Sequence, residues 1–193
     1  MSVAASVAAT LGLLGALITV NAAPVPSPHS LDGSRSKAEF EVHLRLPFRG
    51  IARFDRMRGE LSGDPTKGWQ IALHVDGRSL KFDGPGWMDK ITRSPAFLDV
   101  EQFPSIELHT GIIPDSVLRR GGVAQGELTL RGRTRPATFV LLAPACARPG
   151  LDCDLSVQGT VSRHDFGMSG YRWTLRDGVD VRVRLRWQTQ APP

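Results

Sequence analysis

Histidines are the side chains of this chain best suited to acid–base chemistry or metal binding near neutral pH. His43, His74 and His109 each stand beside an acidic residue, on the polar phase of an apparent strand. A metal site needs three or four such ligands to converge, and nothing in their spacing brings them together. His164 follows directly after another apparent strand. We therefore expect surface and loop histidines, with no metal site and no general base.

Sequence motifs of several enzyme classes are missing. The chain contains no Gly-x-Ser-x-Gly turn, no His-Glu-x-x-His pair and no glycine-rich phosphate loop before a helix. Asp152 and Asp154 flank Cys153 in a turn-like stretch, where solvated carboxylates are ordinary. We expect a protein that is not an enzyme and needs no cofactor. A catalytic pair assembled from different strands is the alternative that motifs leave open.

The chain has two cysteines, Cys146 and Cys153, on either side of a turn-like hexapeptide. Two cysteines facing each other across a hairpin can form a disulfide, which persists in an oxidising compartment. Two alone do not make a structural zinc site. We expect a structural disulfide, the alternative being two unrelated thiols.

The first 23 residues are almost wholly apolar or small, which is typical of a secretory leader cleaved after Ala22 or Ala23. The basic residues that usually precede such a leader are missing, since the first is Arg35. An uncleaved anchor is the alternative, and a periplasmic or secreted protein is expected. The predicted organisation is a signal peptide at 1–23, a proline-rich linker at 24–30, one barrel domain at 31–189 and a tail at 190–193.

Alternating apolar and polar residues at both ends of the chain indicate the elements that must position any site. Residues 40–48 and 179–187 each place apolar side chains at every second position. A strand with this pattern has one face to bury, and a closed or nearly closed antiparallel barrel removes its unpaired edges. Turn signals divide the chain into about eight strands, which include one hairpin arm at 51–61 and a pair joined by a tight hairpin at 131–134, where glycine supports the turn. Residues 83–92 allow a short helix. The sequence predicts an all-β barrel, either packed solid or holding one slender ligand.

The formal net charge is +5, and arginines carry most of it. They are spread over many segments without a long basic run, so nucleic acid is not an expected partner. Arg182, Arg184 and Arg186 share the polar face of the last strand. A filled barrel that meets an acidic partner or a membrane through this face is therefore an alternative function. Peripheral membrane contact and homodimerisation stay open.

Five motifs in order resemble those of the YceI-like polyisoprenoid-binding proteins, which are mostly exported bacterial proteins. The resemblance covers about residues 31–187. The most specific motif is Ser-Pro-Ala-Phe-Leu-Asp-Val-Glu-Gln-Phe-Pro-Ser-Ile at 94–106, and another is Arg-His-Asp-Phe-Gly at 163–167. The remaining motifs are at 53–61, 71–80 and 126–136.

The resemblance implies an extended, lipocalin-like antiparallel barrel with a short helix and an elongated apolar pocket. It implies a polyisoprenoid such as a quinone tail, or another long-chain acyl lipid, as ligand, and no catalytic residues. An accessory role in lipid or quinone redox metabolism is a further alternative. Arg163 and Asp165 are expected to pair and fix a loop. The apolar phase of the strands and the motifs together give these pocket-lining candidates: Phe40, Val42, Leu44, Leu46, Phe48, Ile71, Leu73, Val75, Trp87, Met88, Phe97, Ile106, Leu108, Leu128, Leu130, Val157, Val161, Phe166, Val181, Val183 and Leu185.

Overall fold

A computed structural model describes residues 28–44 and 49–189 of the chain. The predicted signal peptide, most of the predicted linker and the predicted tail lie outside the described residues. His29 and Ser30, at the end of the predicted linker 24–30, form strand β1 and pair with Leu61 and Glu60.

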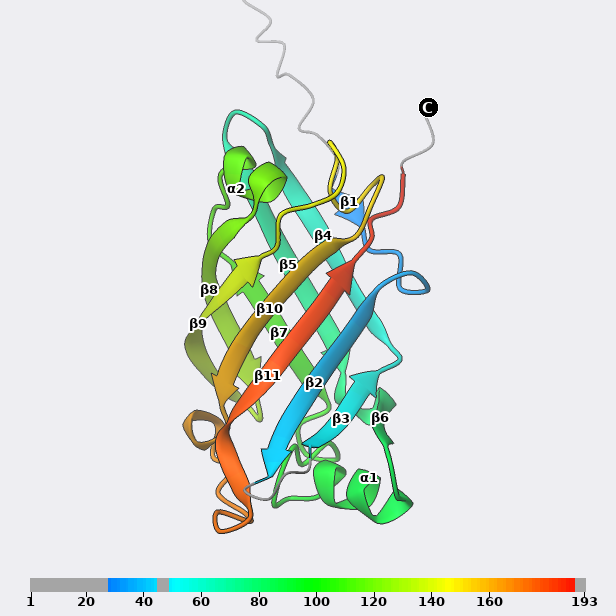
Figure 1. Ribbon diagram of the computed structural model, residues 1–193, viewed down its shortest axis with the longest axis vertical. Helices are drawn as coiled ribbons and strands as arrows, with labels where there is room; N and C mark the ends of the chain where they lie inside the picture. The colour runs from blue at the N-terminus through cyan, green and yellow to red at the C-terminus, as the bar shows by residue number, and fades with distance from the viewer. Residues whose placement is uncertain (1–27, 45–48, 190–193) are drawn as a thin grey trace, which may run out of the picture.

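Over the described residues, eleven strands form one antiparallel sheet that curls around a long axis (Figure 1). The strands are β1 (His29–Ser30), β2 (Lys37–Leu44), β3 (Arg49–Phe54), β4 (Met57–Asp64), β5 (Gly68–Asp76), β6 (Leu80–Asp83), β7 (Ser105–Thr110), β8 (Gly122–Leu130), β9 (Arg133–Leu141), β10 (Leu155–Ser162) and β11 (Leu175–Leu185). The helices are α1 (Gly86–Arg93) and α2 (Asp115–Arg120), with short 3₁₀ turns η1 (Gly77–Ser79) and η2 (His164–Phe166). The all-β barrel-like fold and the helix within 83–92 are confirmed.

The strand count exceeds the predicted eight, partly because one predicted arm at 51–61 is two strands. The chain bends at Asp55 and Arg56, whose backbone groups bond Ser79 and Asp76 instead of continuing the ladder. β3 then pairs with β2 and β6, whereas β4 pairs with β5 and β1. In the described part of the chain, edge strands β1 and β6 do not pair with each other, so the barrel is open along this side.

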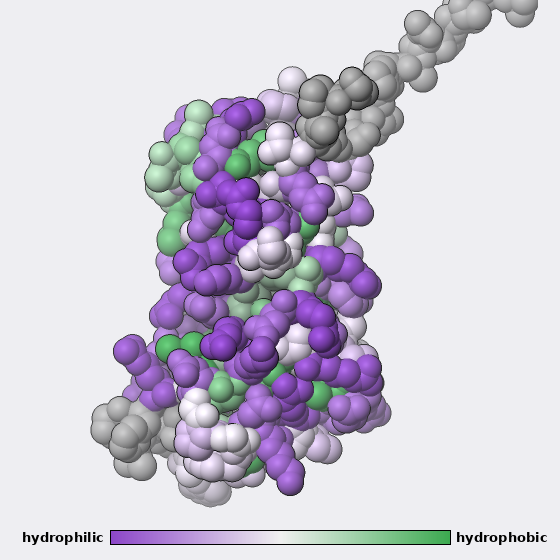
Figure 2. All heavy atoms as spheres, turned by 90° about the vertical axis from the view of Figure 1, so that its right-hand side faces the viewer, coloured by the Kyte–Doolittle hydropathy of each residue, from purple (hydrophilic) through white to green (hydrophobic). Residues whose placement is uncertain are grey.

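The alternation along β11 sets its register between β10 and β2. Val181 lies opposite Gly159 on one neighbour and Phe40 on the other, and Val179 lies opposite Val161 and Val42. These apolar side chains face the interior because successive strand residues point to opposite faces. Figure 2 shows one flank of the resulting surface, which is mostly hydrophilic with hydrophobic residues visible between.

The turn between β8 and β9 consists of Arg131 and Gly132, both with positive φ (50° and 66°). Two positive φ values are what a tight type I′ hairpin needs, and glycine adopts one of them at no steric cost. Arg131 is held in place because its guanidinium donates to the carbonyl oxygen of Phe97 at 2.6 Å. The predicted hairpin at this position is confirmed.

One end of the barrel is packed solid around Trp187, which is fully buried. The loop between the two cysteines closes over this side chain: the Trp187 amide donates to Gly150 O at 2.7 Å, and a Cβ at Gly150 would overlap the indole. The predicted disulfide Cys146–Cys153 is present and ties this loop together. In Figure 1 the loop and α2 lie at the end of the barrel opposite α1. We call this the packed end.

Removing the disulfide in the double variant Cys146→Ser/Cys153→Ser should lower the free energy of unfolding by about 2–3 kcal/mol. The bridge closes a short loop in the unfolded chain, and the entropy that a loop of this length loses corresponds to about 2–3 kcal/mol. Chemical denaturation under oxidising conditions measures the effect. A reductant should destabilise the parent equally and leave the double variant unchanged. Equal denaturation midpoints for parent and variant would contradict the prediction.

Helix α2 is absent from the sequence-based expectations because six residues carry too little periodicity to reveal it. Its place is fixed by tertiary contacts. Trp69 donates from Nε1 to Asp115 at 2.9 Å, and this hydrogen bond is the main reason that the pKa of Asp115 is lowered. Over the described ranges, neither helix has the length and apolar character needed to cross a membrane.

Candidate functional site

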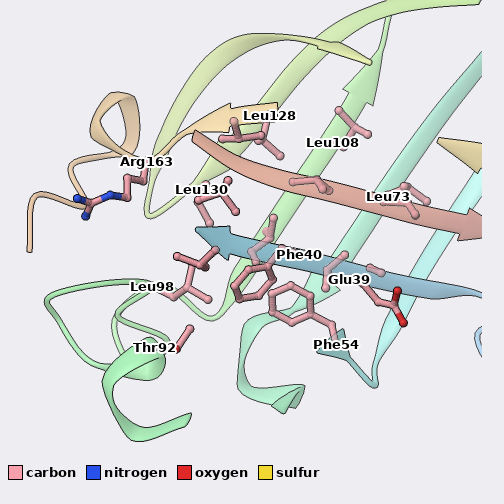
Figure 3. Close-up of a pocket in the computed structure, with 18 of the residues that line it drawn as sticks. Glu39, Phe40, Phe54, Leu73, Thr92, Leu98, Leu108, Leu128, Leu130 and Arg163 are labelled. Atoms are coloured by element: carbon pink, nitrogen blue, oxygen red, sulfur yellow. The ribbon is translucent and has the colours of Figure 1, made fainter. Parts of the chain in front are cut away.

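An apolar cavity of about 130 Å³ lies inside the barrel beyond the packed end. Its wall comes from β2, β3, β4, β5, β7, β8, β9, β10 and β11, from α1 and the segment after it, and from the loop between β10 and β11. In Figure 3 Phe40, Leu108 and Leu130 point toward one another across the interior, whereas the polar residues Glu39, Thr92 and Arg163 lie at the margins. Such a lining offers shape and apolar surface, with few polar groups to orient a ligand.

The structure places many of the predicted pocket residues around this cavity. They are Phe40, Val42, Leu73, Val75, Phe97, Ile106, Leu108, Leu128, Leu130, Val161, Val181 and Val183. Besides the charged residues Glu39 and Arg163, eight further residues of the lining were missed by sequence reasoning. They are Ala38, Phe54, Met57, Leu98, Thr92, Phe139, Met168 and Val179. Val179 and Ala38 share the apolar phase of strands already recognised, so that signal was available. Nothing in the local pattern marks Met57 or Thr92.

Other predicted residues lie elsewhere. Ile71, Val157 and Leu185 belong to the solid core of the packed end, because their strands extend past the closed bottom of the cavity. Phe166 is buried beside the cavity without lining it. Strand alternation gives the correct face for these residues but carries no information about height along the barrel axis.

The remaining candidates fall into two groups. Trp87 and Met88, on α1, line a separate groove rather than the cavity. Leu46 and Phe48 lie outside the described residues, and the structure describes only the backbone of Leu44, in β2.

The groove beside α1 continues the cavity toward the outside. It has a volume of about 310 Å³ and shares Val42, Thr92 and Phe97 with the cavity. Along β11 the combined lining runs from Leu175 in the groove to Val183 in the cavity, which is about 26 Å of strand. Cavity and groove adjoin at these shared residues. We refer to the two together as the apolar channel, whose mouth lies between α1 and the segment after η2. We call this end the mouth end.

Arg163 is fully buried and organises the loop at the mouth end. Its guanidinium donates to the carbonyl oxygens of Arg176 (3.0 Å), Met168 (2.9 Å) and Gly170 (2.5 Å). Its Cζ lies 5.9 Å from the centre of the Phe97 ring. Burial lowers the pKa of Arg163 from its ordinary value. The expected pair with Asp165 is wrong, because backbone carbonyls take the place of the carboxylate.

Three histidines, His43, His74 and His164, lie within ion-pair distance of carboxylates. His43 lies 2.7 Å from Asp180, and the pKa of Asp180 is lowered by hydrogen bonds from His43 and Thr160. His74 lies 3.5 Å from Glu107. No group of three potential metal ligands occurs in the part of the chain that the structure describes.

Two of the three arginines on the polar face of residues 179–187 are neutralised by ion pairs. Arg182 forms an ion pair with Glu41 at 3.0 Å, and Arg186 with Asp154 at 2.6 Å. Glu41 is buried beneath Arg182 although it points away from the interior. A face with two of its three arginines already paired offers a weaker attraction for an acidic partner than its composition suggests.

Comparison with known proteins agrees with the architecture. The model of the YceI-like domain matches residues 29–191. The fold is similar to BcnA of Burkholderia cenocepacia, with a TM-score of 0.64 at 18% identity, covering 82% of this chain and 99% of that one. It is also similar to a polyisoprenoid binding domain from Saccharophagus degradans implicated in plant cell wall breakdown, with a TM-score of 0.62 at 15% identity, covering 85% and 98%.

A third solved structure with this fold is the Campylobacter jejuni YCEI protein, with a TM-score of 0.58 at 16% identity over 72% of this chain and 85% of that one. No curated protein is similar enough to match. Because the family model spans nearly all of the described barrel, the chain belongs to the YceI-like domain family.

Proposed function

We propose that this protein is an exported binding protein that holds a long isoprenoid or acyl chain in its apolar channel. The observation that carries the proposal is the apolar lining itself, in which side chains such as Phe40, Leu108 and Leu128 border an unfilled volume. Family membership supports it, as does the fold shared with a domain described as polyisoprenoid-binding. The disulfide favours an oxidising compartment.

The dimensions favour a slender, flexible ligand. The enclosed cavity of about 130 Å³ is of the size that accommodates a single small aromatic ring. A longer molecule must therefore continue into the groove, because cavity and groove together extend over about 26 Å of β11. Each methylene transferred from water would contribute about 0.8 kcal/mol, so a long chain would bind without a charged partner. Binding without chemical conversion fits this lining, since it brings no acid–base pair together.

Native mass spectrometry of the protein, exported by a bacterial host and purified without detergent, tests the proposal. A discrete added mass, identified after extraction as a prenyl or acyl lipid, is the expected result. A protein that stays unliganded, and remains so with added long-chain quinone, would overturn it.

A larger side chain in the cavity should displace the ligand. Leu128→Trp introduces an indole into a space of about 130 Å³, and we expect bound lipid to fall at least tenfold. The matched control is Gln125→Trp, on the outward face of the same strand, which should retain parental lipid. Extraction and quantification from both purified variants measures the difference. Equal lipid content in Leu128→Trp and the parent would place the ligand elsewhere.

A further inference from the structure

Three large aromatic side chains are exposed at the mouth end. The exposed fraction is 61% for Trp87, 48% for Tyr171 and 92% for Trp173. Trp87 belongs to α1, whereas the other two follow η2, and Figure 1 places both segments at the same end of the barrel. Exposing an indole to water is unfavourable, so this arrangement needs a reason other than stability.

The exposed aromatics are continuous with the channel. Trp87 and Tyr171 line the groove, and the Tyr171 ring stacks on Phe97 with 5.9 Å between ring centres. Phe97 in turn lines the cavity. An apolar chain leaving the cavity would therefore pass directly between aromatic side chains to the outside.

The loop that carries Trp173 is held by a defined set of hydrogen bonds. Arg163 binds the carbonyl oxygens of Met168 and Gly170, and the amides of Thr174 and Leu175 donate to Tyr171 O at 3.1 and 2.9 Å. Trp173 lies between these anchors. The exposure of Trp173 therefore follows from the hydrogen-bonded conformation of this loop.

The charge around the mouth is weakly positive. Lys90, Arg172 and Arg176 are exposed and form no ion pair with another described residue. Asp89 is paired with Arg93, and Asp177 with His164. The carboxylates left nearby are Asp83 and Asp165, together with Asp177 when His164 is neutral. Arg133, whose guanidinium lies beside Gly167, is a further exposed cation without an ion pair among the described residues, so cations exceed anions by one.

We propose that the mouth end docks on the surface of a lipid bilayer, with Trp87 and Trp173 inserted at the level of the headgroups. Tryptophan and tyrosine favour this depth because their rings are apolar and their N–H or O–H groups can reach water. The adjacent cations complement anionic headgroups. Docking in this orientation lets a chain move between leaflet and channel without crossing water, a consequence that rests on the function proposed above.

Flotation with vesicles of phosphatidylcholine and phosphatidylglycerol tests the docking. The double variant Trp87→Ser/Trp173→Ser should partition at least tenfold more weakly than the parent. The control Arg182→Gln/Arg184→Gln, on the outer face of β11, should partition as the parent does. Raising the salt from about 0.1 to 1 M shortens the screening length from about 10 to 3 Å, and it should weaken binding only a few-fold because the aromatic side chains dominate. Vesicles containing lipids with brominated acyl chains should quench the fluorescence of the parent.

Several outcomes would overturn the proposal. They are a parent that does not bind these vesicles, equal binding by the tryptophan variant, and binding that high salt or the arginine variant abolishes. Lipid content measured on the same purified samples separates this inference from the proposed function. Vesicle binding by a protein that never carries lipid would leave docking standing and remove the cargo. Bound lipid without vesicle binding would support the proposed lipid cargo and overturn docking.

Discussion

Trp187→Ala should lower the free energy of unfolding by about 3–5 kcal/mol, the range for removing a large buried aromatic side chain. Trp187 is 1% exposed and fills the centre of the packed end. Its backbone also pairs with Leu31 and Gly150. Those neighbours are held in place by other contacts, so the vacated volume cannot close fully. Urea denaturation followed by circular dichroism measures the loss.

The matched control for this substitution is Trp173→Ala at the opposite end. Its side chain is 92% exposed, so removal should change stability by less than about 0.5 kcal/mol. A loss below 1 kcal/mol for Trp187→Ala would mean that the packed end does not support the fold.

Arg163→Met should lower the free energy of unfolding by about 2–4 kcal/mol. The methionine retains the aliphatic stem but leaves the carbonyl oxygens of Arg176, Met168 and Gly170 without their donor. Each buried acceptor that loses its partner costs about 1–3 kcal/mol. Methionine carries no charge, so the variant avoids the cost of burying the guanidinium, which offsets part of this loss of stability. Thermal unfolding measures the stability, and hydrogen exchange should show faster opening of the segment after η2.

Arg58→Met is the control, because Arg58 is exposed on β4 and forms no ion pair with the residues that the structure describes. This variant should have the same thermal unfolding midpoint as the parent. If Arg163→Met were equally stable, the loop at the mouth would be held by contacts other than this guanidinium.

The barrel architecture could be predicted from the sequence because alternation reports burial on one face of each strand. The pattern at 179–187 identified β11 correctly, and the tight Arg131-Gly132 turn followed from glycine between two apolar runs. The break at Asp55 and Arg56 gave no such signal. Its cause is the pairing of the two halves with different neighbours, which is a property of the assembled sheet.

The site was predictable in kind and less so in extent. Leu128 and Leu185 have the same inward phase on their strands, yet one lines the cavity and the other is packed solid. Their difference is height along the barrel, which depends on where Trp187 and the disulfide loop close it. Arg163 fixes the loop as predicted, but its partners were missed, because the carbonyl groups that it binds leave no mark in the sequence.

The packed end closes the channel at one end, and a channel closed at one end can select ligands by length. Under the proposed function, a ligand would enter with its apolar tail first, and Trp187 and its neighbours would set the depth at which the tail stops. Each added methylene should strengthen binding until the tail reaches that stop. Beyond that length, further carbons stay outside the mouth and add little. Selection by this barrel would then act on the length of the tail and leave the headgroup free to vary.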